Sequence, residues 1–140
     1  MSYEFSAGLQ AAVYRRLSDD PDLASMIGGA IHDAPIKVAA GETAPDHITL
    51  GEEKVRSNDT QTSRGAVHDF NVTVHSGRDG FETVKRIAGA VCANLIDAPL
   101  ALASGHLVAL RFLAAKAERG RAPEKRKVSL RFRAVVDQNI

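Results

Sequence analysis

Tryptophan is absent from this chain of 140 residues, and the other aromatic residues are few, with five phenylalanines and two tyrosines. Because hydrophobic residues still make up 44% of the sequence, a core must be built mainly from Val, Leu, Ile and Ala. The single cysteine, Cys92, excludes an internal disulfide and a CxxC metal-binding pair. No apolar run approaches the roughly 20 residues that a membrane span requires, so we expect no membrane partner.

The first ten residues also lack the charged and then apolar segments of a secretory signal, which favours a protein of the reducing cytoplasm. The length predicts a single domain over residues 1–140. The net charge of +1 hides an uneven distribution. Residues 1–106 hold nine basic and 14 acidic residues, whereas residues 107–140 hold nine basic and three acidic residues. This uneven charge favours contact with nucleic acid or with an oppositely charged neighbour. The alternative is a basic hairpin that is only solvated by water.

The N-terminal segment is predicted to be helical, because apolar residues recur every four positions from Phe5 to Leu17. We expect Ser2 to cap this helix and Glu4 to lie in its first turn. Asp20 and Pro21 are typical of the start of a second, short helix, which Gly28 and Gly29 end.

A longer helix is predicted after Gly80, with Asp79 as its capping residue and Glu82 three positions on. Its apolar positions continue for about five turns to Asp97, and Pro99 follows. Five segments have the alternation or the composition of strands: residues 30–33, 46–56, 67–75, 107–115 and 127–136. A polar hairpin tip is expected at 57–65, and a charged one at 116–126.

This order of elements predicts an α+β fold, with an antiparallel sheet of about four to five strands and two main helices packed on one face. The inward positions of the strands and of the longer helix share one periodicity and should line the core: Phe70, Val72, Val74, Phe81, Val84, Ile87, Val91, Leu95, Leu110, Phe112, Leu130 and Phe132.

The five histidines do not form a recognisable catalytic or metal-binding motif. His68 and His75 are an odd number of residues apart on one strand, which places them on opposite faces. Neither HxH nor HExxH occurs, and Cys92 lies on the apolar stripe of the longer helix, where it acts as a small hydrophobe. Gly77 to Gly80 lacks the spacing of a phosphate loop. We therefore expect no catalytic residue, no cofactor and no metal, and a protein that is not an enzyme.

Basic residues near the C-terminus are the strongest candidates for a functional surface. They gather on the last strand and on the tip before it, and the candidates are Arg119, Arg121, Lys125, Arg126, Arg131 and Arg133. The basic strand has no exposed aromatic residue for base stacking, so non-specific attraction to phosphate is the only nucleic-acid contact that it favours.

The chain resembles the tail terminator-like, or tail completion, family of long-tailed phages and gene transfer agents. The resemblance covers nearly the whole chain. It is carried by six segments in order: LASMIGG at 23–29, IHDAP at 31–35, PDHITLGE at 45–52, VHDFNVTVHS at 67–76, VKRIA at 84–88 and VSLRFRA at 128–134.

The resemblance implies a structural protein that is assembled in the bacterial cytoplasm and lies at the head–tail junction of a phage-like particle. It implies a homo-oligomeric ring, a hexamer, that caps the tail tube, stops its polymerisation and joins it to the head-side connector. DNA would pass through the lumen with transient, non-specific contact. A head-side stopper protein and a nucleic-acid-binding module that uses the basic C-terminal hairpin are the alternatives.

Overall fold

The N-terminal region forms two helices, α1 (Ser6–Ser18) and α2 (Pro21–Ile27), in a computed structural model that describes residues 3–138. The start of α2 is as predicted, because the Asp20 carboxylate accepts a hydrogen bond of 2.9 Å from the Leu23 backbone N–H. Gly28 ends α2 in the left-handed conformation, at φ 61°. The proposed cap Ser2 lies outside the described residues. Glu4 precedes α1 and does not lie in its first turn, so that part of the prediction is wrong.

The longer helix, α3, runs from Glu82 to Leu95. Its 14 residues make about four turns, one fewer than predicted. Asp79 does not cap it, because Phe81 occupies the capping position and the Asp79 carboxylate binds Lys125 Nζ at 2.8 Å. A tertiary ion pair has therefore replaced the expected local cap.

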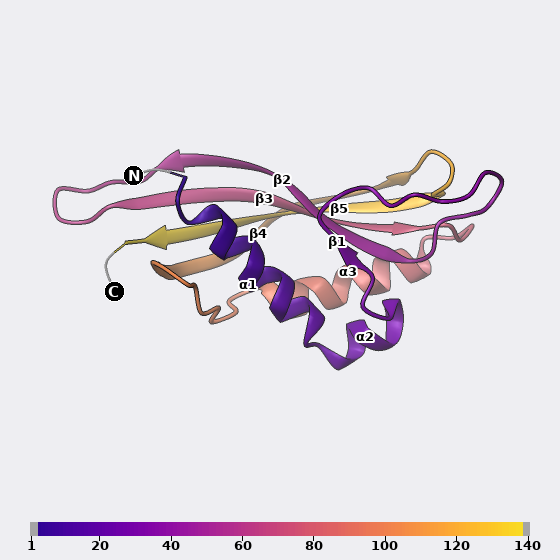
Figure 1. Cartoon of the computed structure of the whole chain (residues 1–140), viewed down its shortest axis with the longest axis horizontal. Helices are drawn as coiled ribbons and strands as arrows, with labels where there is room; N and C mark the ends of the chain where they lie inside the picture. The colour runs from indigo at the N-terminus through magenta and orange to yellow at the C-terminus, as the bar shows by residue number, and fades with distance from the viewer. Residues whose placement is uncertain (1–2, 139–140) are drawn as a thin grey trace.

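Within residues 3–138, five strands form one sheet in the order β1-β2-β3-β5-β4. Their bounds are β1 Ile31–His32, β2 His47–Ser57, β3 Gly65–Ser76, β4 His106–Arg119 and β5 Arg126–Asp137. The four long strands are antiparallel to their neighbours, whereas β1 is parallel to β2, so the sheet is mixed. The helices lie on one side of the sheet and leave its other face open (Figure 1). The predicted α+β fold is confirmed.

The core lies between the helices and the sheet. Ten of the twelve predicted core residues are buried, and Phe132 at its centre has no exposed surface. Phe81 is half-buried. The prediction that Phe112 lies in the core is wrong, because 42% of its surface is exposed. Phe112 shares a face with Phe132 but lies on β4, the edge strand of the sheet, and the register shifts directly after it. An edge position covers a side chain on fewer sides than a central strand does.

The C-terminal hairpin has longer strands than the sequence predicts. β4 continues to Arg119, so only residues 120–125 separate it from β5. Lys116 and Glu118, which were expected in the tip, are paired with Ser129 and Lys127 of β5. Around Lys116 and Glu118, small residues alternate with charged ones, and this hides the apolar–polar alternation by which a strand is recognised in a sequence.

Candidate assembly surface

The tip of the C-terminal hairpin, residues 120–125, is held against two other segments (Figure 1). The Lys125 N–H donates to the Ser76 carbonyl at 2.8 Å, and the Ala44 N–H donates to the Pro123 carbonyl at 2.9 Å. Backbone bonds thus fix the tip beside the end of β3 and the loop before β2. The tip therefore does not project alone from the fold.

The four basic side chains of this hairpin end lie in different environments. Arg119 and Arg121 are exposed. Lys125 forms the ion pair with Asp79, which lowers the pKa of that carboxyl through a direct hydrogen bond. Arg126 is half-buried, with its guanidinium carbon 4.9 Å from the centre of the Phe81 ring. Arg119 and Arg121 are therefore the most accessible, and Arg126 has a packing role as well.

Arg131 and Arg133 lie on the open face of the sheet. Arg133 donates two hydrogen bonds to the Asp69 carboxylate, at 2.8 and 3.0 Å, and this contact holds the pKa of Asp69 below its usual value. Arg131 is exposed. The sequence placed these two side chains on the same outward face, and the strand register agrees.

Two charged rows cross this open face, because residues directly opposite each other in antiparallel strands share a face. One row joins Lys54, Asp69, Arg133 and Arg111, with three bases to one acid. The other row, near the anchored tip, joins His47, His75, Lys127 and Glu118. The open face is therefore polar and of mixed charge, with a basic excess toward the first row.

The outer strand β4 presents an apolar edge. Val108, Phe112 and Leu113 expose 57%, 42% and 37% of their surfaces. β4 occupies the end of the strand order, and within the described residues β5 is its one strand neighbour, while its Leu110 carbonyl accepts a hydrogen bond of 3.0 Å from the Asp97 N–H. An open edge strand with large apolar side chains is a ready surface for a second chain.

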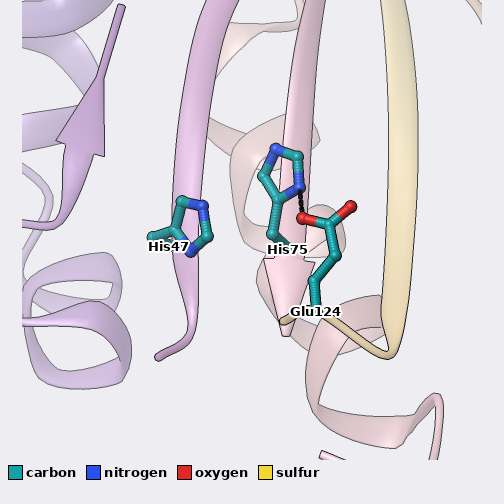
Figure 2. A group of neighbouring side chains, drawn as sticks. All are labelled: His47, His75 and Glu124. Carbon is teal, nitrogen blue, oxygen red and sulfur yellow. Dashed lines mark hydrogen bonds and ion pairs between the residues drawn. The ribbon is translucent and has the colours of Figure 1, made fainter. Parts of the chain in front are cut away.

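Beside the tip, His47, His75 and Glu124 form a compact cluster. The imidazoles are paired across β2 and β3 and stack with their centroids 4.6 Å apart and their planes 8° from parallel. Glu124 reaches His75 from the tip (Figure 2), with 2.5 Å between Oε2 and Nδ1. Burial lowers the pKa of His75, and the Glu124 carboxylate opposes that shift.

Sequence reasoning missed this cluster because it compared neighbours along the chain and not across strands. His47 and His75 lie at equal distances from the centre of the β2–β3 hairpin, and that symmetry was the available signal. Glu124 has no such signal, since the backbone bonds that anchor the tip are tertiary. The prediction that His68 and His75 occupy opposite faces agrees with the strand register, and His68 is buried beneath the helices.

Comparison with known proteins relates this arrangement to phage tails. Residues 11–137 match the family described as "Tail completion protein gp17". The chain belongs to the tail completion protein family. It is also similar to a chain in the solved structure "Virion of native gene transfer agent (GTA) particle", with 41% identity and a TM-score of 0.86. That match covers 97% of this chain and 99% of the other. Among curated proteins, none matched.

A tail completion protein has a structural role, and this membership favours a protein that is not an enzyme. Burial raises the pKa of the Cys92 thiol, as for a cysteine that packs and does not react. Within residues 3–138, no helix is long and apolar enough to cross a membrane.

Proposed function

We propose that this tail completion protein is a tail terminator. It forms a ring, a hexamer, on the end of the tail tube, stops tube polymerisation and joins the tube to the head-side connector. DNA passes through its lumen. The protein is assembled in the bacterial cytoplasm and becomes part of the particle at the head–tail junction. The observation that carries the proposal is the likeness, along 97% of this chain, to a chain of a gene transfer agent virion.

The two edges of the sheet support a ring of identical subunits. At one edge lies β4 with its exposed apolar side chains, and at the other β1 pairs with Ile48 and Thr49 of β2. The longer part of β2, beyond Thr49, therefore has an outer edge that β1 does not cover. Contact between two unlike edges is heterologous, and such contacts close into rings when the rotation between subunits allows it.

The open sheet face suits contact with passing DNA. Its Lys54–Asp69–Arg133–Arg111 row attracts phosphate weakly, while Asp69 offsets part of the positive charge. A lining of mixed charge lets DNA slide, because tight binding to phosphates grows with the number of uncompensated cations. We assign Arg131 and Arg133 to this role. The basic residues at the end of the hairpin are assigned to assembly contacts: Arg119, Arg121, Lys125 and Arg126.

The test is the mass of the purified protein, alone and with its tail tube, by analytical ultracentrifugation. A hexamer of 15.0 kDa chains has a mass of about 90 kDa. We expect the hexamer to bind to the ends of tail tubes. Tubes to which it has been added should no longer elongate. A protein that stays monomeric with tubes and leaves their growth unchanged refutes the terminator role. Binding to the connector but not to the tube identifies the stopper alternative. Duplex binding that weakens steeply with salt, without tube binding, identifies the nucleic-acid module.

A further inference from the structure

The cluster of His47, His75 and Glu124 combines two imidazoles and one carboxylate. One ligand atom from each residue lies within 4.8 Å of the others. Two histidines and a glutamate are a known zinc ligand set, and imidazole also suits other late transition metals. We propose that these three residues bind a divalent transition-metal ion, for which Zn²⁺ is the best match. This inference is independent of the proposed ring.

His47 is already oriented as a metal ligand. Its Nδ1 lies 2.7 Å from the Pro45 carbonyl oxygen. A carbonyl only accepts hydrogen bonds, so Nδ1 carries the proton and Nε2 carries the lone pair. Metal-binding histidines almost always donate their second nitrogen to a carbonyl or a carboxylate, which fixes the tautomer and the ring orientation. His47 has this partner, and its burial restricts the ring further.

His75 faces Glu124 through Nδ1 and Thr49 through Nε2. The carboxylate accepts from Nδ1 at 2.5 Å, and the Thr49 hydroxyl lies 2.8 Å from Nε2. A hydroxyl can donate to an unprotonated nitrogen, so the neutral ring satisfies both contacts. An ion bound between Nδ1 and the Glu124 carboxylate would take the place of the Nδ1 proton, and the proton of the neutral ring would then lie on Nε2, which donates to the Thr49 hydroxyl oxygen.

Binding requires a small rearrangement, because an imidazole nitrogen binds a metal in the plane of its ring and the two planes are now nearly parallel. Ligand atoms that are about 2.0–2.2 Å from zinc lie about 3.4 Å apart, so ligand atoms that are now up to 4.8 Å apart must approach by up to about 1.4 Å. A hollow of about 670 Å³ opens over the cluster and gives the ion and its remaining water ligands access. Its lining includes all three residues and Thr49.

The charges around the cluster permit a cation. In the forms that bind a metal, two imidazoles and one carboxylate together carry one negative charge, which a divalent ion overcompensates by one. Lys127 is opposite His75 in the register, but its Nζ lies 3.6 Å from a Glu118 carboxylate oxygen, which offsets its charge. The bound ion would join β2 and β3 to the hairpin tip, and so fix the segment that bears Arg121 and Lys125.

The test is calorimetric titration of Zn²⁺ into the full chain after treatment with a chelator, with Co²⁺ absorption as a second probe of the ligands. We expect one ion per chain and at least tenfold weaker binding in His75→Gln and Glu124→Gln. His106→Gln is the matched control, because His106 is exposed on β4 and its exchange should leave the affinity unchanged. Circular dichroism in chelator checks that each variant folds.

Three outcomes overturn the proposal. One is a folded wild-type protein that takes up no Zn²⁺ at about 1 mM, a concentration that detects even very weak sites. Another is a folded Glu124→Gln variant that binds as tightly as the wild type. The last is an equal loss of affinity in His106→Gln, which would indicate scattered surface binding.

Discussion

Replacing Phe132 by Ala gives the sharpest test of the core. The side chain has no exposed surface, and its ring lies 5.8 Å from that of Phe70 and 6.0 Å from that of Phe112. Deleting a buried phenylalanine side chain costs about 3–5 kcal/mol, through lost transfer energy and the cavity left behind. At about 3 °C per kcal/mol for a chain of this length, Tm should fall by about 10–15 °C.

The assay is urea and thermal unfolding followed by far-UV circular dichroism, since the absence of tryptophan removes the usual fluorescence probe. Both proteins are measured at one concentration, because assembly adds stability by mass action. Phe112→Ala is the matched control, as its ring touches the same cluster from the exposed edge. We expect it to cost less than half as much. An unchanged midpoint for Phe132→Ala, or a larger loss for Phe112→Ala, would refute the assigned faces of the strands.

The remaining predictions concern charge and chemistry. Asp69→Asn should remove about 1 kcal/mol of stability at neutral pH. Because the hydrogen bonds from Arg133 hold the folded-state pKa of Asp69 below its usual value of 3.8, this difference should begin to shrink near pH 4 and should vanish only below that lower folded-state pKa, and pH-dependent melting checks it. Cys92 should react with iodoacetamide more slowly in the folded protein than in urea, since burial raises the pKa of its thiol; equal rates would contradict its packing role. Replacing the exposed cations at the end of the hairpin, Arg119, Arg121 and Lys125, by Ser should give overlong or headless tails in particle assembly. Tm should change little, because the Lys125–Asp79 pair that is lost is exposed to solvent. Normal tails would show that this end of the hairpin is a solvated loop.

Much of the fold follows from local patterns. The alternation in residues 67–75 and 128–136 identified β3 and β5, and the four-residue spacing from Phe5 to Leu17 identified α1, because burial on one face imposes these periods. Asp20 before Pro21 gave the start of α2 for an equally local reason. These signals need no knowledge of the rest of the chain.

The errors occur where distant segments meet. Asp79 has the sequence of a helix cap, yet Lys125 captures its carboxylate. Phe112 has an inward position on its strand, yet the strand lies at the sheet edge. The parallel pairing of β1 with β2 and the approach of Glu124 to His75 likewise depend on tertiary contacts. These contacts join residues that are far apart in the sequence, so no repeating pattern of apolar residues within one segment predicts them.

The strand order also bears on synthesis of the protein. β5 follows the other four described strands in chain order, but it lies in the interior of the sheet, between β3 and β4. Until β5 leaves the ribosome, β3 and β4 have no common partner, and the hairpin that carries Pro123 and Lys125 to Ala44 and Ser76 cannot close. A chain that stops before Arg126 would thus leave two separate strand edges open and would not form a shorter version of the same sheet. Nascent chains should therefore acquire their fold late and in one step, so that incomplete copies lack the surface needed to join a growing particle.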